Sequence, residues 1–412
     1  MKLFTKFFAL LLIAVCSFTV IACNNNGDDG KKDYENWCFE FDVDTDDDGL
    51  SFATITGLYV PDTMLTDYSN GLIKALDLVV GTENDGKVGL KAQKDDDKVD
   101  SSKYKNVSYA DGYYYGFDYL KIGDDAFANQ TIIGTVTVAE SVKEIGVASF
   151  AGCSSITKME LPFVGNQAKD ALNAKKVFAN IFGTSEATGC TSTTVYYNSS
   201  ASTAFYIPDG LKEIVINYTD KTHMDAEGKI ENPNYTEALP VCAFNALAKV
   251  TKITVNGNIK TIGQSAFASC SALIEVNLPA TIETIGSKAF SGCSSLVTLD
   301  LAKLTALKAI YQEAFSGCAK LGLGYETVTL TAGVKLYDKA FASCVSIKAL
   351  DLTGIDVIPE GCFLGCTALE KVTLDSGAVL MNNAFVNCTA LKKENVVNYN
   401  ETYKNAFDWF NV

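Results

Sequence analysis

The feature that most constrains this chain is a phenylalanine that returns at a nearly constant interval. It stands in the pattern Ala-Phe-x-x-Cys, as in residues 266–270 and 289–293. The interval is 22 to 26 residues within two blocks, which contain Phe127 and Phe150, and then Phe244, Phe267, Phe290, Phe315, Phe341, Phe363, Phe385 and Phe407. An interval of this size is typical of stacked structural repeats, so we expect a repeat solenoid.

One repeat runs from Phe267 to Phe290, with apolar residues at regular places and polar or small residues between them. Its segment Val276-Asn277-Leu278 alternates apolar and polar side chains, which is typical of a short strand with one buried face. The same alternation returns at residues 299–301, 328–330, 350–352 and 372–374. Because one coil cannot bury its own apolar side, neighbouring coils must stack at ~4.8 Å and form a parallel sheet along one face.

These repeats resemble the BspA-like leucine-rich repeats of bacterial surface proteins, whose unit reads Ile-Gly-x-x-Ala-Phe-x-x-Cys-x-x-Leu-x-x-(Val/Ile)-x-(Leu/Ile)-Pro. The motif is carried by residues 122–127, 145–153 with 161–162, 262–270 with 278–279, and 285–293. The resemblance covers residues 121–165 and 211–412. It implies a mainly β array of right-handed coils, with a parallel sheet on one face and short irregular or helical turns on the other.

A few units depart from this motif. Gln130 and Leu247 stand where the motif has cysteine, and Cys362 replaces the alanine before Phe363. The last unit, residues 406–410, stops before a coil is complete. We interpret the first changes as ordinary variation and the last as a C-terminal cap of the second block.

Between the two blocks, residues 166–210 lose the interval and become rich in Ser, Thr, Gly, Asn and Tyr. Similar segments occur inside BspA-like arrays, so the resemblance implies an insertion within one coil rather than a linker between domains. An insertion of this length projects from one face of a solenoid, where it can carry a binding site. The alternative interpretation is a packed flap without a ligand.

The first residues have the pattern of an export signal. Two lysines precede an apolar run at residues 7–21, and the sequence Val-Ile-Ala-Cys that ends at Cys23 resembles the lipobox of bacterial lipoproteins. We expect residues 1–22 to be a signal peptide, Cys23 to be lipidated and residues 23–33 to form a tether, which indicates the bacterial outer membrane or cell surface. An ordinary signal peptide and a membrane span are the alternatives, but the run is shorter than the ~20 residues that a span needs.

Composition narrows the possible partners. The chain has 34 basic and 49 acidic residues and a formal net charge of −15. No stripe of Lys and Arg stands out, so a nucleic-acid partner is not expected. Anionic membrane surfaces would repel the body, which leaves the lipid anchor as the expected membrane contact.

Thirteen cysteines in an exported chain suggest disulfides, but their spacing argues against pairing. Seven of them occupy the same place in their repeats: Cys153, Cys270, Cys293, Cys318, Cys344, Cys366 and Cys388. A buried thiol there acts as a small apolar group and a weak donor to the turn, and parallel side chains do not readily reach disulfide geometry. We expect a ladder of free thiols, and pairing among Cys38, Cys190, Cys242 and Cys362 stays open.

Residues 34–120 lack the repeat and are expected to form a small β-rich cap, with strands at residues 39–43 and 52–56. Between these strands Asp44, Asp46, Asp48 and Gly49 match the start of a calcium-binding loop. Position twelve of that loop is Ile55 instead of glutamate. We therefore prefer a solvated hairpin turn and expect no metal and no cofactor.

Six tyrosines crowd the end of the cap: Tyr104, Tyr109, Tyr113, Tyr114, Tyr115 and Tyr119. Tyrosine offers rigid contact area and a hydroxyl for binding carbohydrate or protein. Alternate tyrosines in a strand also simply pack a cap, and we prefer that interpretation.

Catalytic signals are weak. The single histidine, His223, lies in a polar segment, and no Gly-x-Ser-x-Gly or His-Glu-x-x-His motif is present. We therefore expect that the protein is not an enzyme.

The outward side of the predicted sheet is the main candidate for function. Its alternating positions give one column: Glu160, Thr254, Asn277, Asp300, Thr329, Asp351 and Thr373. Polar side chains on a stiff face can bind a partner, although any soluble solenoid also needs a solvated face. The leading hypothesis, suggested by adhesin-like members of the family, is a lipid-anchored surface protein that binds an extracellular protein or glycan. The alternative is an envelope structural or glycan-capture role without a host ligand.

Overall fold

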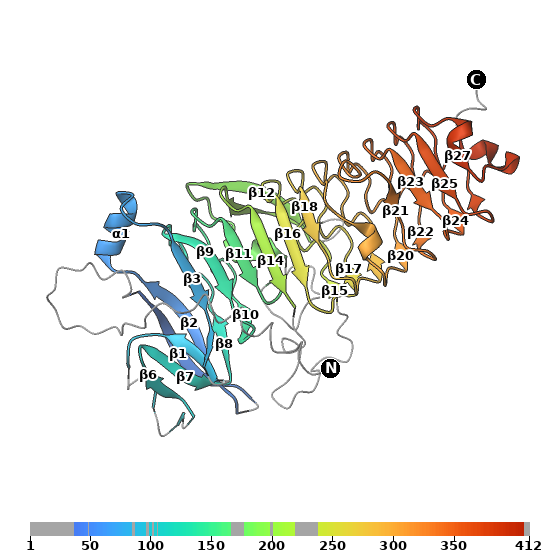
Figure 1. Ribbon diagram of the computed structural model, residues 1–412. Coiled ribbons are helices and arrows are strands. Elements are labelled where there is room, and N and C mark those ends of the chain that lie inside the picture. The colour runs from blue at the N-terminus through green and yellow to red at the C-terminus, as the bar shows by residue number, and fades with distance from the viewer. Residues whose placement is uncertain are drawn as a thin grey trace.

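The computed structural model describes residues 37–47, 49–84, 87–95, 99–100, 103–104, 106–165, 177–197, 201–218 and 238–407. Cys23, the rest of the expected signal peptide and tether, and His223 lie outside these residues. Figure 1 shows an elongated array in which successive strands follow one another from the N-terminal part towards the C-terminus. The predicted mainly β repeat solenoid is confirmed.

The main sheet face is a ladder of parallel strands in two segments. The first segment contains, in spatial order, β3 (Leu76–Val80), β9 (Ile133–Val138), β11 (Lys158–Leu161), β14 (Glu213–Asn217), β16 (Lys252–Asn256) and β18 (Glu275–Asn277). The second segment contains β21 (Val328–Thr329), β23 (Ala349–Leu352), β25 (Lys371–Leu374) and β27 (Val396–Val397). Between them only one bridge, Glu275 to Thr298, continues the pairing, and the chain forms a 3-10 helix, η4 (Leu301–Lys303).

A second ladder, which the sequence analysis did not predict, runs along another side of the array. Its strands are mostly two residues long: β15 (Ala238–Leu239), β17 (Thr261–Ile262), β19 (Thr284–Ile285), β20 (Ala309–Ile310) and β22 (Lys335–Leu336), followed by the pair β24 (Val357–Ile358) and β26 (Val379–Leu380). In β17, β19, β22 and β24 one residue is buried and its neighbour is half-buried or exposed, as with Ile285 and the half-buried Thr284, whereas both residues of β15 and β20 are buried. Two-residue strands are too short to show alternation in a sequence, which explains why this ladder was missed.

The N-terminal region contributes a coil of the array. β2 (Ser51–Tyr59) pairs in parallel with β8 (Tyr119–Ile122), which also pairs with β10 (Val142–Ile145), while β3 pairs in parallel with β9. The helix α1 (Asp62–Ser69) connects β2 to β3 in place of the Ala-Phe turn. Residues 51–80 are therefore stacked like a repeat although they lack its motif, and the array begins before residue 121.

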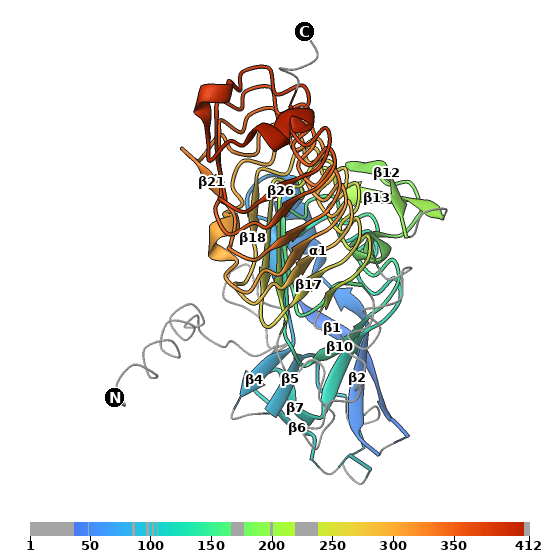
Figure 2. The same cartoon turned by 90° about the vertical axis from the view of Figure 1, so that its right-hand side faces the viewer.

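The rest of this region is antiparallel. β1 (Cys38–Thr45) forms a hairpin with β2, which confirms both the predicted strands and the predicted hairpin turn. A four-stranded sheet, in the order β4 (Thr82–Asn84), β5 (Lys87–Lys91), β7 (Tyr113–Phe117) and β6 (Ser108–Ala110), lies beside the first coils (Figures 1 and 2).

One coil is interrupted between the neighbouring strands β11 and β14. It contains the 3-10 helix η2 (Phe178–Phe182) and an antiparallel hairpin of β12 (Cys190–Tyr196) and β13 (Ser202–Pro208). Figure 2 shows this hairpin projecting from the side of the array. The amide of Phe150 donates to the carbonyl of Ile181 at 2.7 Å, as the amide of Phe244 does to Ala266, so η2 takes the place of the Ala-Phe turn in this coil.

The repeated phenylalanines form a continuous stack in the interior. From Phe244 to Phe407 successive ring centroids lie 4.7 to 5.4 Å apart, and the rings are within 24° of parallel. Phe407 follows η6 (Glu401–Ala406), which comes after η5 (Lys393–Asn395), and it is the last described ring of the stack. The rings hold adjacent coils at one spacing because each fills the space above the previous one.

Each repeated phenylalanine up to Phe385 sits between two residues in the left-handed backbone region. Around Phe290 these are Lys288, with φ of 56°, and Gly292, with φ of 77°. The amides of all three residues donate to carbonyls of the next coil at 2.7 to 2.9 Å. The left-handed conformation at alternate residues thus turns the backbone. It also directs the amides of Lys288, Phe290 and Gly292 towards the neighbouring coil.

The repeated cysteines form the expected ladder of free thiols. Every one of the eleven cysteines in the described ranges is a free thiol. Sγ of Cys293 donates to the carbonyl of Phe267 in the preceding coil at 3.0 Å, and the other six repeat cysteines make the equivalent bond at 2.9 to 3.3 Å. Burial raises the pKa of Cys153 and of Cys270 to about 12.

The left-handed positions give a paired stability test, because Gly292 and Ser269 occupy the same place in adjacent coils, with φ of 77° and 63°. A Cβ added to Gly292 would lie 3.7 Å from the nearest atom of another coil, so Gly292→Ala introduces backbone strain without a clash. We expect Gly292→Ala to lower the free energy of unfolding by ~1 kcal/mol and Ser269→Gly to raise it by ~0.5 kcal/mol. Urea unfolding followed by circular dichroism measures both, and equal stability of the three proteins would contradict this account.

The thiols give a test of burial. Cys190 is only half-buried, and loss of solvent together with the charge of Asp209 raises its pKa. Iodoacetamide attacks the thiolate. We therefore expect native protein to be alkylated first at Cys190, with a rate that increases as the pH rises past the ordinary thiol pKa, whereas Cys270 reacts only after unfolding. Mass spectrometry of timed samples measures this, with Cys190→Ser as the control, and equal rates at the two sites would refute the buried ladder.

Candidate functional site

The main sheet face aligns the predicted column of residues. Strand register places Glu160 beside Val215, Val215 beside Thr254, and Thr254 beside Asn277. In the second segment Thr329 lies beside Asp351, and Asp351 beside Thr373. All seven predicted side chains are exposed or half-buried. The column is therefore real but is divided by the interruption around Thr298 and η4.

A network of polar side chains occupies the first segment of this face. Asn217 donates from Nδ2 to Oε1 of Glu160 at 2.6 Å, and Asn256 donates from Nδ2 to Oδ1 of Asn217 at 2.8 Å. Asn277 donates to Oε1 of Glu275 at 2.7 Å, and Nζ of Lys252 lies 3.2 Å from the same oxygen. The hydrogen bond from Asn277, reinforced by Lys252, holds the pKa of Glu275 below its usual value.

The sequence analysis missed Asn217 and Asn256. They follow Ile216 and Val255 at the place where the repeat motif has proline, as in Leu161-Pro162 and Leu278-Pro279. A side chain with donors and acceptors thus replaces proline in two consecutive coils. The replacement of a motif residue by a polar one was the signal that could have identified both.

Two predicted residues of the column serve local turns. Oδ1 of Asp300 accepts a hydrogen bond from the amide of Ala302 at 3.2 Å and caps η4. Oδ1 of Asp351 accepts from the amide and the hydroxyl of Thr353 at 3.0 and 2.7 Å. Short Asp side chains that bond to the residue two positions later commonly fix turns. These two carboxylates therefore fix local turns and do not take part in the network of the first segment.

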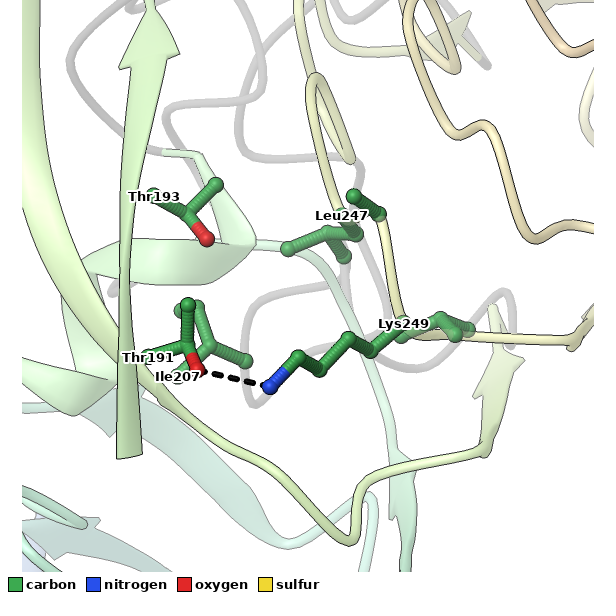
Figure 3. A pocket seen from close by; sticks show the side chains of 7 residues that line it. Thr191, Thr193, Ile207, Leu247 and Lys249 are labelled. Atoms are coloured by element: carbon green, nitrogen blue, oxygen red, sulfur yellow. Dashed lines mark hydrogen bonds between the residues drawn. The ribbon is translucent and has the colours of Figure 1, made fainter. Parts of the chain in front are cut away.

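The hairpin β12–β13 is fastened to the array by one charged group. Nζ of Lys249 donates to Oγ1 of Thr191 at 2.6 Å (Figure 3). It also contacts the carboxylate of Asp209. The hydrogen bond from Lys249, followed by that from Thr191, lowers the pKa of Asp209. The small pocket between hairpin and coil is lined mainly by Ile207, Leu247 and the stem of Lys249. Two of its polar groups, those of Thr191 and Lys249, bind each other, which agrees with the interpretation of the hairpin as a packed flap.

The tyrosines of the N-terminal region are largely used in packing. Tyr104 and Tyr114 are buried, and the hydroxyl of Tyr104 donates to the carbonyl of Val43 at 3.2 Å. Tyr109 packs edge-on against Tyr114. Tyr113 and Tyr115 are half-buried and stack on each other with ring centroids 5.8 Å apart. This arrangement agrees with the preferred interpretation of a packed cap.

The acidic loop between β1 and β2 is closed by its own hydrogen bonds. Oδ1 of Asp46 accepts from the amide of Leu50 at 2.9 Å, and Oδ2 accepts from the hydroxyl of Tyr119 at 2.9 Å. Asp48 lies outside the described residues. Within the described ranges no group of three or more His, Cys, Asp and Glu residues has the arrangement needed to hold a metal ion.

Helices of the described part of the chain are all too short or too polar to cross a membrane.

Comparison with known proteins identifies the repeats. Residues 120–225, 191–322 and 304–411 match the family model of a BspA type leucine-rich repeat region, in six copies. Among curated proteins no sequence matches this chain.

Several solved structures are similar to it. A leucine-rich repeat protein of T. pallidum is 23% identical over 46% of this chain and 82% of its own, with a TM-score of 0.37. A leucine-rich repeat protein from Bacteroides ovatus is 19% identical over 86% of this chain and 80% of its own, with a TM-score of 0.34. A leucine-rich cell surface protein from Faecalibacterium prausnitzii is 17% identical over 89% of this chain and 95% of its own, with a TM-score of 0.30.

The family match extends over most of the chain and agrees with the repeat geometry described above. This chain belongs to the BspA-type leucine-rich-repeat family.

Proposed function

We propose that this protein is a lipid-anchored bacterial surface protein that binds an extracellular protein or glycan through its main sheet face, as an adhesin does. The family consists of binding proteins without enzymatic activity, and its members are typically found at the cell surface. The observation that carries the proposal is the aligned polar network from Glu160 to Asn277.

The network suits recognition for two physical reasons. Its amides and carboxylates are held on stacked strands, so few rotamers have to be fixed when a partner binds. It also contains donors and acceptors side by side, as the half-buried Asn217 and the exposed Asn256 illustrate, which matches the hydroxyl groups of glycans and the polar groups of proteins. An acidic chain with a net charge of −15 disfavours an anionic partner.

Membrane attachment rests on the sequence around Cys23. The signal-like run and the lipobox-like residues 20–23 support cleavage before Cys23 and acylation of its thiol. The polar residues up to about 33 would separate the anchor from the array. An envelope role without a host ligand is the competing proposal, and the binding experiment below distinguishes the two.

The binding face can be tested by paired substitutions. Asn256→Lys and Asn277→Lys each place a long cation in the network, and we expect either to weaken binding to the recognised member of a panel of matrix proteins, mucins and glycans at least ~10-fold, which corresponds to ~1.4 kcal/mol. Ser271→Lys adds the same charge at an exposed turn and should leave binding unchanged. Surface plasmon resonance with the purified full chain measures the affinities.

Three other outcomes of this binding experiment would each contradict the proposed binding face. Equal loss in the Ser271→Lys control would mean that charge alone is responsible. Unchanged binding in both test variants would exclude the main sheet face, and no binding to any member of the panel would favour the envelope role.

The anchor can be tested by Cys23→Ser, which removes the thiol that would be acylated. We expect the wild-type chain to be recovered in the membrane fraction and to incorporate labelled palmitate, and the variant to lose the label and its membrane association. Cys16→Ser is the matched control, because Cys16 lies within the expected signal peptide. Labelled, membrane-bound Cys23→Ser protein would contradict lipidation at this residue.

A further inference from the structure

The outward side of the second ladder carries an exposed apolar strip near the C-terminal end of the array. We call the following five residues the apolar strip: Tyr311, Tyr337, Val357, Val379 and Met381. Their exposed fractions are 37%, 40%, 41%, 51% and 47%. Values this high are unusual for five neighbouring large apolar side chains in a well-packed protein, since exposed apolar residues are normally scattered singly.

The strip runs over stacked coils. Strand register joins β20 to β22 and β24 to β26, and the coil of β22 is joined to that of β24 by the amides of Lys339 and Phe341, which donate to the carbonyls of Glu360 and Cys362. Ile310 pairs with Leu336, so Tyr311 and Tyr337 follow at equal places in adjacent coils, and their rings stack with centroids 4.7 Å apart. Val357 pairs with Val379, and Met381 lies two residues beyond Val379 on the same side. The strip therefore covers four consecutive coils, those of β20, β22, β24 and β26.

In the preceding coils the outward side of the second ladder is not apolar. There the outward positions are Thr261 and Gly263, then Thr284 and Gly286, which are polar or lack a side chain. A Cβ added to Gly263 or Gly286 would lie 2.6 or 2.7 Å from backbone of the neighbouring coil. Glycine thus permits close backbone approach in those coils, whereas in the later coils the equivalent place holds Tyr311, Tyr337, Pro359 or Met381.

This change of surface gives the array no evident packing advantage. The interior of the later coils has the same stacked phenylalanines and buried cysteines as the earlier ones. Half-exposed Tyr, Val and Met side chains leave apolar area in water, and a contiguous apolar patch rimmed by polar groups is typical of an interaction surface.

The charged side chains around the apolar strip are grouped by coil. Lys335 and Lys339 flank Tyr337 in one coil, together with Asp338, while Asp356 and Glu360 belong to the next coil. None of these five exposed side chains forms an ion pair within the described residues. In the coils just before them, by contrast, charges of the same ladder are paired, namely Lys288 with Glu313 and Lys308 with Glu283.

We propose that the apolar strip is the contact between two copies of this chain, which meet face to face about a two-fold axis between β22 and β24. A two-fold contact requires a surface that complements itself. Rotation about this axis places the coil of Lys335, Asp338 and Lys339 opposite the partner's coil of Asp356 and Glu360, so side chains with a summed charge of +1 meet side chains with a summed charge of −2. Elsewhere the acidic surfaces of two copies repel each other, because the net charge is −15.

The shape of the apolar strip is also suited to packing against a second copy of this chain. Flat sheet faces pack on each other at ~10 Å, with side chains such as Val and Tyr interleaved. Four coils at ~4.8 Å extend less than ~20 Å, and three residues of a strand extend ~10 Å, so the strip covers ~200 Å², which is less than the ~800 Å² per partner of a standard interface. We therefore expect a reversible dimer with a dissociation constant in the micromolar range rather than a permanent one.

Sedimentation velocity of the purified full chain over a series of concentrations tests this proposal. We expect a concentration-dependent dimer, and we expect Tyr337→Asp to raise its dissociation constant at least ~10-fold, or ~1.4 kcal/mol. Leu323→Asp is the matched control, since Leu323 is 56% exposed in the loop before β21 and lies outside the strip. A chain that stays monomeric, or a dimer unaffected by Tyr337→Asp, overturns the proposal.

A charge exchange tests the two-fold arrangement independently of folding. Lys335→Glu should weaken the dimer, and the double variant with Lys335→Glu and Asp356→Lys should restore it, because both copies then carry the reversed pair. A double variant no better than Lys335→Glu would refute this pairing. If Tyr337→Asp instead abolished binding of an extracellular protein by a monomeric chain, the strip would belong to a different partner and the proposal would be wrong.

Discussion

The structure depends on one packing constraint, which is that no coil can bury its apolar side without a neighbour. The phenylalanine stack satisfies it, because each ring fills the space above the previous one at 4.7 to 5.4 Å from Phe244 onwards. The two left-handed residues around each ring up to Phe385, such as Lys288 and Gly292, turn the backbone so that its amides reach the next coil. The Cys293 thiol adds a bond in the opposite direction, to the coil before. Ring, turn and thiol therefore bind each coil to both neighbours.

The parts that the sequence predicted are those that this constraint repeats. The turns around Phe267 and Phe290, the free thiols and the strands of the main sheet face all follow from the interval. What the sequence did not reveal lacks repetition or length. Residues 51–80 form a coil with a helix, α1, in place of the phenylalanine turn, and η2 does the same after β11. Strands of two residues, such as β17, are too short to show a period.

The candidate sites also divide into residues whose place follows from the repeat and residues whose place does not. Sequence alternation correctly placed Thr254 and Asn277 side by side on the outward face, because register follows from the stacking. It could not show that the Asp351 carboxylate bonds to Thr353, since that depends on a local turn. Asn217 and Asn256 were missed because they replace a motif proline, and Tyr311 because it replaces a motif glycine. Departures from the repeat thus mark parts of both proposed binding surfaces.

These departures are separated along the array in a way that matters for function. The polar network ends at Asn277, at the last strand of the first segment, and the apolar strip begins at Tyr311, beyond the interruption around Thr298 and η4. The two surfaces also lie on different ladders. A second copy on the strip would therefore leave the main sheet face open, and each dimer would present two such faces. Since the stability of a solenoid is close to a sum of nearest-neighbour contacts, substitutions on one surface perturb the other little. Dimerisation would then increase the avidity for an extracellular partner through two linked sites, without any change in the affinity of a single face.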